Sequence, residues 1–115
     1  MQILVTGATG FVGRSVMERL ERSGYDARPY HGRITDSLAL RAELEGIDTV
    51  IHLASSEGRG RKRLLQHVDI DGAERLLDRC RRAEVQRFIF VSRLGAVANS
   101  LHPLLGAKDT IERMV

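Results

Sequence analysis

Cysteine is scarce in this sequence, and long apolar runs are absent from it. The single cysteine, Cys80, cannot form a disulfide within the chain, which favours a reducing compartment. No apolar run approaches the roughly 20 residues that cross a bilayer, and the N-terminus has no basic segment followed by an apolar one. The sequence therefore predicts a cytoplasmic protein that does not span a membrane.

Lysine and aromatic residues are also rare. Only Lys62 and Lys108 are lysines among 18 basic residues, and the net charge is +3. The densest basic cluster, residues 59–63 (RGRKR), could meet phosphates of a nucleic acid or of a cofactor. Aromatic residues make up 4% of the chain, which leaves little to stack on bases. We therefore favour a solvated loop at this cluster over a nucleic-acid contact.

Size and composition are those of one small globular domain over residues 1–115. Hydrophobic residues make up 43% and charged residues 29% of the chain, which is ordinary for a protein with its own core. Short apolar runs predict strands at residues 2–6, 48–53 and 88–91. A weaker strand is expected at residues 25–31, where Pro29 suits an edge position because it cannot donate to a strand neighbour.

Amphipathic segments separate these strands and predict helices. They cover residues 11–23, a short stretch between the capping residue Asp36 and Gly46, residues 61–83 and residues 104–114. The apolar stripe of the first helix consists of Phe11, Val12, Val16, Met17 and Leu20. Strands alternate with helices four times, which predicts a parallel sheet with helices on both faces.

Three glycines stand three residues apart just after the first strand, at Gly7, Gly10 and Gly13. In a parallel sheet this turn lies at the carboxyl edge, where ligands bind. Gly7 would permit the tight turn, Gly10 would let a phosphate approach the backbone, and Gly13 would let the helix pack closely. Free amides and the helix dipole would face the anion. The context favours dinucleotide binding; the alternative is a scaffold whose site has been lost.

Five segments along nearly the whole chain carry a family resemblance. They are residues 6–13 (TGATGFVG), 50–54 (VIHLA), 68–72 (VDIDG), 87–96 (RFIFVSRLGA) and 102–108 (HPLLGAK). Together they resemble extended and atypical short-chain dehydrogenases/reductases, among them the NAD-dependent epimerase/dehydratase and NmrA-like proteins. The resemblance implies a Rossmann-like, doubly wound parallel sheet of about four strands, truncated relative to the family, and NAD or NADP as cofactor. The implied cofactor contacts are Gly7, Thr9, Gly10, Phe11, Val12, Gly13, Leu53, Ala54 and Lys108.

The family's catalytic pattern is incomplete in this sequence. The family uses a tyrosine as acid/base, a lysine four residues later that lowers its pKa, and a Ser or Thr that orients the substrate oxygen. Lys108 matches the lysine, but Leu104 stands at the tyrosine position and Arg93 at the Ser/Thr position, directly after Ser92. Lys108 either binds a ribose or is an exposed helical lysine. Ser92 either contacts substrate or cofactor, or caps the next turn.

Two functions therefore remain open. One is an oxidoreductase or epimerase relative, in which Lys108 and Ser92 are the catalytic candidates. The other is a non-catalytic NAD(P) sensor, regulatory or assembly protein of the NmrA-like type. The residues identify no substrate.

The end of the second strand bears on the choice between NAD and NADP. A carboxylate there favours NAD, whereas a basic group accepts the NADP phosphate. Asp26 lies at the wrong end of the strand, and Asp36 is expected to cap a helix. His31 and Arg33 lie at the right end, so NADP is slightly favoured.

The chain ends in the helix after the fourth strand, whereas family members continue with further strands and a substrate-binding part. Either it is an N-terminal fragment, or it is a reduced member that pairs with another chain. A sheet edge left exposed at that point would favour a homodimer.

Overall fold

Four parallel strands form one sheet in the computed structural model, which describes residues 1–56, 65–98, 100 and 102–115. The strands are β1 (Gln2–Thr6), β2 (Asp26–Pro29), β3 (Thr49–His52) and β4 (Arg87–Phe90), in the spatial order β2-β1-β3-β4. The predicted parallel sheet is confirmed. Pro29, which pairs with Val5, lies on an edge strand as expected.

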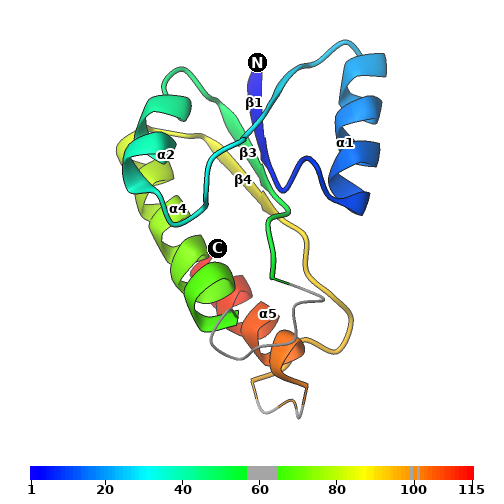
Figure 1. Ribbon diagram of the computed structural model, residues 1–115, viewed down its shortest axis with the longest axis vertical. Coiled ribbons are helices and arrows are strands. Elements are labelled where there is room, and N and C mark those ends of the chain that lie inside the picture. Colours follow the sequence, from blue (N-terminus) through cyan, green and yellow to red (C-terminus); the bar gives the residue numbers. More distant parts are fainter. Residues whose placement is uncertain (57–64, 99, 101) are drawn as a thin grey trace.

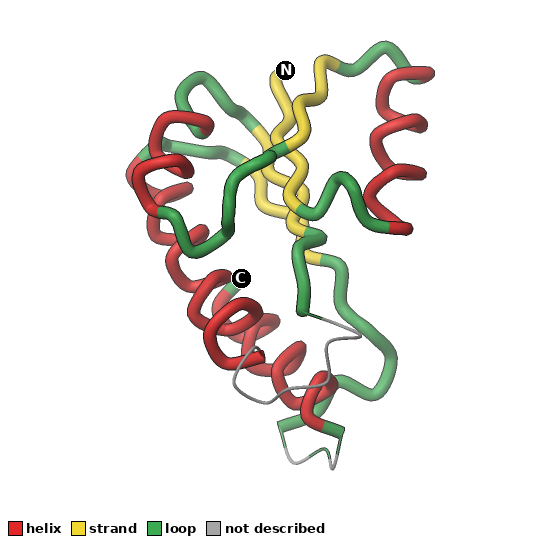
Figure 2. Tube along the Cα trace, in the orientation of Figure 1, coloured by secondary structure: helices red, strands yellow, loops and turns green. Residues whose placement is uncertain are grey.

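Helices cover both faces of this sheet, as the alternation of elements predicted (Figure 1). Helix α1 (Phe11–Arg22) lies on one side, and α2 (Ser37–Glu43), α4 (Gly72–Arg82) and α5 (Pro103–Met114) lie on the other. All four strands run the same way, so their carboxyl ends and the loops that follow gather at one edge (Figure 2). We call this edge the carboxyl edge.

The core has two layers because strand side chains alternate between the faces of the sheet. Leu4 and Val50 are fully buried in the cluster on the α2 and α4 side, whereas Ile3 and Val5 lie in the cluster on the α1 side. The same alternation continues to the carboxyl edge. It places Thr6 and His52, two residues beyond Leu4 and Val50, on the α4 side.

The helix predicted for residues 61–83 differs from the expectation where the structure describes it. A π-helical segment, η1 (Leu65–Asp71), precedes α4. The predicted apolar face is confirmed in α4, where Leu76 and Cys80 are buried, but in η1 the buried residue is Asp69. Residues 61–64 and the basic cluster at residues 59–63 lie outside the described residues.

The apolar stripe predicted for α1 is only partly confirmed. Met17 and Leu20 pack against the core, but Phe11 is 93% exposed and Val12 is 52% exposed. The reason is positional: these two residues follow the glycine turn directly and lie at the rim of the carboxyl edge. Periodicity identified the helix but did not show where the sheet beneath it ends.

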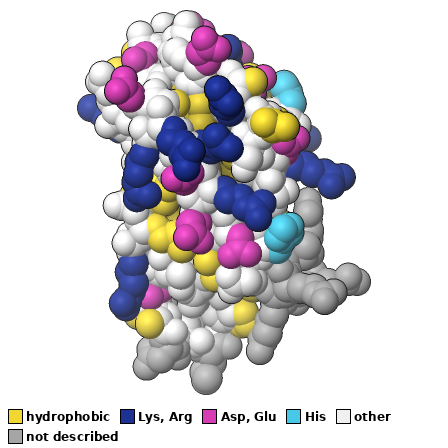
Figure 3. All heavy atoms as spheres, turned by 90° about the vertical axis from the view of Figure 1, so that its left-hand side faces the viewer, with side chains coloured by type: hydrophobic (Ala, Val, Ile, Leu, Met, Phe, Trp, Pro, Cys, Tyr) yellow, Lys and Arg dark blue, Asp and Glu magenta, His cyan; other side chains and the backbone are white. Residues whose placement is uncertain are grey.

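Charges of both signs are mixed on the face formed by α2 and α4 (Figure 3). Asp78 and Arg82 form an ion pair of 3.1 Å along α4, and the Arg75 guanidinium donates to the carbonyl of Thr35. Because acids accompany the arginines, this face shows no single-signed patch. No helix in the described part of the chain is both long and apolar enough to cross a bilayer.

Candidate functional site

Gly7 brings the turn after β1 against the loop after β3. Its φ of 69° lies in the left-handed region that favours glycine. A Cβ at Gly7 would lie 2.6 Å from the nitrogen of Ala54 and 2.7 Å from the carbonyl carbon of Leu53. The structure therefore brings together the glycine turn and Leu53–Ala54, two segments that were assigned to one site on family resemblance alone.

Gly13 and Gly10 differ in what the surrounding chain demands of them. A Cβ at Gly13 would overlap the carbonyl oxygen of Gly7 and lie 2.7 Å from the Cα of Ala8, so close packing of α1 requires glycine there. Among the described residues, a Cβ at Gly10 would meet only the Gly7 oxygen, at 3.4 Å, and the backbone (φ −73°, ψ 177°) suits any residue. Neither packing nor conformation explains why position 10 is glycine.

The start of α1 presents backbone donors at this turn. Gly10 is the N-cap and has no side-chain capping bond, and its own amide donates to the Gly7 carbonyl at 3.2 Å. Helix geometry leaves the amides of Phe11, Val12 and Gly13 without an intrahelical acceptor. The first turn of α1 contains no acid, so nothing offsets the positive end of the helix dipole.

Arg14 and Thr9 also lie at this turn. The Arg14 guanidinium Nε donates to the Thr9 carbonyl at 3.0 Å, which holds a positive charge beside the turn. Thr9 itself is exposed at the turn, as a residue that contacts a ligand must be. Together with the amides of α1, these groups make the turn suitable for an anion.

Thr6 ties the end of β1 to the end of β3. Its hydroxyl oxygen accepts from the amides of Leu53 at 3.1 Å and Ala54 at 3.2 Å, and lies 2.7 Å from Nδ1 of His52. Thr6 is fully buried. No role for Thr6 or His52 was predicted from the sequence; the available signal was two polar residues at the ends of otherwise apolar strands.

The buried carboxylate of Asp69, in η1, binds the other end of the loop that follows β3. Asp69 is 3% exposed, and its two carboxylate oxygens accept from the amide and the hydroxyl of Ser56, each at 2.8 Å. Loop 53–56 is thus fixed at both ends by side-chain hydrogen bonds. Asp69 belongs to a segment that carries the family resemblance, but no function was predicted for it, although an acid on an apolar helical face was a usable signal.

The segment after β2 carries the residues predicted for the adenosine half of a cofactor. His31 and Arg33 are exposed at the carboxyl edge, whereas Tyr30 is buried and donates its hydroxyl to the Arg33 carbonyl at 2.8 Å. Burial raises the pKa of Tyr30, which keeps this donor protonated.

Asp36 accepts from the Ala39 amide at 3.1 Å, so the predicted helix cap is confirmed. Asp26 pairs with Gln2 at the opposite edge, as expected.

Lys108 is buried, which rules out the alternative of an exposed helical lysine. Its side chain is only 9% exposed, Nζ donates to the Val91 carbonyl at 3.3 Å, and Nζ lies 4.9 Å from the centre of the Phe90 ring. One helical turn earlier, Leu104 is 5% exposed. The family's tyrosine position is therefore occupied by a packed aliphatic side chain.

Ser92 does not cap the turn after β4. Its hydroxyl oxygen is buried and has no hydrogen-bond partner among the described residues. Arg93, at the Ser/Thr position, is exposed, and so is His102, the N-cap of α5. His102 was expected at the surface, and the structure confirms this. No group of three or more metal-ligating side chains occurs in the part of the chain that the structure describes.

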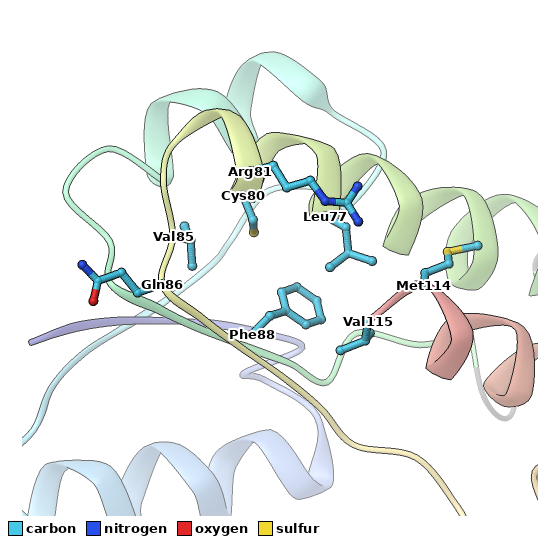
Figure 4. A pocket seen from close by; sticks show the side chains of 8 residues that line it. All are labelled: Leu77, Cys80, Arg81, Val85, Gln86, Phe88, Met114 and Val115. Atoms are coloured by element: carbon cyan, nitrogen blue, oxygen red, sulfur yellow. The ribbon is translucent and has the colours of Figure 1, made fainter.

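A hollow lies away from the carboxyl edge, between α4, α5 and the beginning of β4 (Figure 4). Phe88 and Cys80 point into it from the sheet and from α4. Burial raises the pKa of the Cys80 thiol to about 12, so this packed thiol stays protonated near neutral pH. The glycine turn and His52 lie at the opposite edge of the sheet.

Comparison with known proteins places these features in a family. The sequence model of the NAD dependent epimerase/dehydratase family matches residues 3–103. A 3 beta-hydroxysteroid dehydrogenase/Delta 5-->4-isomerase of Mycobacterium tuberculosis is 31% identical over 96% of this chain and 36% of its own length. The photosystem II assembly factor Ycf39 of Cyanophora paradoxa is 27% identical over the whole chain and 41% of its own length.

A solved structure shows the same architecture. A short-chain dehydrogenase/reductase superfamily protein from Agrobacterium tumefaciens, crystallised with bound NAD, superimposes with a TM-score of 0.82 at 26% identity. The match covers 99% of this chain and 44% of that protein, so the chain spans less than half the length of each of these three proteins. With the glycine turn, the sheet order and the family match in agreement, this chain belongs to the NAD-dependent epimerase/dehydratase family.

Proposed function

We propose that residues 1–115 form one cytoplasmic dinucleotide-binding domain, which holds the pyrophosphate of NAD or NADP against the glycine turn. The observation that carries this proposal is Gly10, because neither packing nor conformation requires glycine at that position. A close phosphate does require it. The amides of Phe11, Val12 and Gly13 supply the donors, and the Thr9 backbone completes the turn.

The two halves of the dinucleotide extend in opposite directions from this turn. The adenosine lies toward β2, where His31 and Arg33 are exposed and no unengaged carboxylate is available, which slightly favours NADP. The nicotinamide half passes Leu53 and Ala54 toward β4 and α5. There Lys108 binds the ribose, and Ser92 contacts cofactor or substrate.

Fluorescence titration with NADPH and NADH tests the binding proposal. We expect Gly10→Val to weaken both by about tenfold or more, because the loss of even one charge-assisted phosphate bond has that size. Ser15→Val is the matched control, since it places the same side chain at an exposed position of the same helix. Equal binding by the wild type and Gly10→Val would overturn the proposal.

For the role of the bound cofactor, we propose a non-catalytic, NAD(P)-dependent sensor or assembly function ahead of an oxidoreductase or epimerase activity. The observation that favours it is the buried Leu104, which offers no proton where the family carries its acid/base. The similarity to an assembly factor supports the same choice. In either case Lys108 keeps its place beside the cofactor.

Hydride transfer decides between the two roles. Purified protein is incubated with NADPH and a panel of carbonyl compounds, and absorbance at the nicotinamide band is followed. We expect no turnover above that of a Lys108→Met control, although the cofactor binds. Turnover that depends on Lys108 would establish the oxidoreductase role instead.

We also propose that the free edge of β4 joins a second copy of this chain. β4 is the last strand in the sheet order, and Ile89 and Val91 on this strand and just after it are 42% and 45% exposed. Light scattering of the wild type and of Ile89→Lys tests this directly. We expect a dimer that the lysine converts to a monomer; a monomeric wild type would contradict it.

A further inference from the structure

Two buried polar atoms lie at the carboxyl edge without a hydrogen-bond partner in the described residues. They are Nε2 of His52, whose side chain is 1% exposed, and the hydroxyl oxygen of Ser92. His52 pairs in register with Phe90, and Ser92 follows two residues later, so both side chains face the α4 and α5 side. Buried polar groups are almost always hydrogen-bonded, so two neighbouring exceptions indicate a missing partner.

The hydrogen bonds of Thr6 determine which nitrogen of His52 carries the proton. The Thr6 oxygen already accepts from two amides, those of Leu53 and Ala54, so its single hydrogen is left to donate. Among the described residues, the acceptor that this hydrogen meets is Nδ1 of His52, 2.7 Å from the Thr6 oxygen. A neutral imidazole that accepts at Nδ1 carries its hydrogen at Nε2, so the unpartnered atom is a donor.

The surroundings keep this imidazole neutral. Burial, together with the nearby Lys108 ammonium, lowers the pKa of His52 to about 4. The rings of Phe88 and Phe90 lie 5.9 Å and 6.0 Å from the imidazole, and Lys108 lies over Phe90. The one buried acid among the described residues, Asp69, has both oxygens bonded to Ser56. The partner that these donors lack is therefore an oxygen from outside the described chain.

We propose that the Nε2–H of His52 and the hydroxyl of Ser92, beside the Lys108 ammonium, donate to an oxygen of the ligand's non-adenine half at the carboxyl edge. This inference rests on the proposed dinucleotide binding and adds a specific donor pair to it. An uncharged imidazole N–H is a suitable donor because it polarises an oxygen without giving up its proton. Both the terminal ribose and the nicotinamide carboxamide carry such an oxygen.

Nitrogen-15 NMR of histidine-labelled protein at pH 7.5 tests the donor directly. In the free protein we expect one histidine, His52, with Nδ1 unprotonated and Nε2 protonated. NAD⁺ and ADP-ribose should shift the Nε2–H resonance, whereas AMP, which lacks the second half, should not. A shift with ADP-ribose identifies a ribose oxygen, and a shift with NAD⁺ alone identifies the carboxamide.

Two outcomes would overturn the inference, and fluorescence titration separates them. If NAD⁺ binds but the Nε2–H resonance stays in place, the partner is an internal water only, and dinucleotide binding stands. If NADPH and NADH do not bind at all, the proposed function fails together with the inference. Thr6→Val is an added check, because loss of the Thr6 hydroxyl should release the tautomer preference of His52.

Two substitutions of His52 distinguish a hydrogen bond that His52 donates to the ligand from a purely structural role of this residue. His52→Gln keeps an N–H donor near Nε2, whereas His52→Asn keeps only a group near Nδ1. We expect His52→Asn to weaken NAD⁺ binding by about fivefold to tenfold, the effect of one buried hydrogen bond, and His52→Gln by less than about threefold. AMP affinity should stay unchanged in both, and the exposed His102→Gln is the control.

Ser92 provides the second arm of the test. Ser92→Ala should weaken NAD⁺ binding by about fivefold, and Ser92→Thr should restore it, because threonine keeps the hydroxyl. Equal losses for NAD⁺ and AMP in all these variants would show that the two residues only support the fold, and would overturn the inference.

Discussion

The turn after β1 and the segment from β4 to α5 lie at the same edge of the sheet but are built on different principles. In the turn, backbone amides and small residues form the surface, and the family pattern from Thr6 to Gly13 is intact. In the second region the family resemblance implies three catalytic side chains, and Leu104 and Arg93 stand at two of the positions matched to them. A site made of backbone amides depends on the fold, whereas a site made of side chains depends on residue type.

The difference has a physical basis. Backbone donors depend on packing, and Gly7 and Gly13 are required by the close approach of β3 and α1. A substitution there would disturb the fold itself, so selection for the fold also maintains the amide geometry. Leu104 fills its position as a packed apolar residue, which costs the fold nothing and removes a proton donor. Four predictions probe these contrasts.

The largest effect on the free energy of unfolding should come from replacing glycines of the turn. Gly13→Ala forces a Cβ onto the Gly7 carbonyl, so we expect it to lower the free energy of unfolding by about 3 kcal/mol or more. Gly10→Ser should change it by less than about 0.5 kcal/mol, because serine and glycine differ little as N-caps. Urea denaturation of both variants measures this. Equal stability losses would show that Gly10 also has a packing role, and would remove the main argument for a phosphate.

The next effect concerns pH and the buried imidazole of the second region. An unfolded histidine takes up its proton near pH 6.5, whereas folded His52 does so near pH 4. Between these values the unfolded state binds the extra proton, so the free energy of unfolding should fall as the pH drops, by up to about 3 kcal/mol. His52→Gln should reduce this acid-dependent loss, measured by urea denaturation at pH 7.5 and 4.5. The exposed His102→Gln should leave the loss unchanged; an unchanged loss in His52→Gln would contradict the assignment.

A smaller effect is expected after β2, where we propose that the adenosine lies. Arg33→Asp replaces a group that would pair with the NADP phosphate by one that would repel it. We expect the ratio of NADP to NAD affinity to fall by about tenfold, the size of one charge-assisted bond. Titration with both reduced cofactors gives the ratio, and Arg41→Asp, on α2, is the charge-matched control. An unaltered ratio would place the 2′-phosphate elsewhere.

The smallest effect separates a structural acid from a ligand-binding one. Asp36→Ala removes the cap of α2 and should lower the free energy of unfolding by about 1 kcal/mol. Asp36→Asn keeps the capping oxygen and should restore most of that stability. Neither change should alter NADH affinity relative to the wild type. A selective loss of NADH binding would show that Asp36 contacts the ribose.

Much of the fold followed from local pattern. The strands at residues 2–6, 48–53 and 88–91 were predicted within one or two residues, because each is a short apolar run. Helix periodicity was less informative at the ends of helices. It placed Phe11 in the packed stripe of α1, although the rim of the sheet leaves that side chain in solvent.

The candidate site divides in the same way. The glycine spacing, the cap at Asp36 and the departures at Leu104 and Arg93 were readable from the sequence, since each depends on residue type at a fixed place in the chain. The Thr6–His52 and Ser56–Asp69 hydrogen bonds were not, because their partners are 46 and 13 residues apart. Nor did the sequence decide that Lys108 is buried beneath the carboxyl edge.

The sequence by itself determined the order of strands and helices, the glycine turn and the family to which the chain belongs, because local propensity and spacing are written in consecutive residues. Tertiary structure alone decided which glycine is free of packing demands and which polar atoms are left without partners. Those properties depend on what the rest of the chain places within a few ångströms, and only the assembled sheet and helices define that.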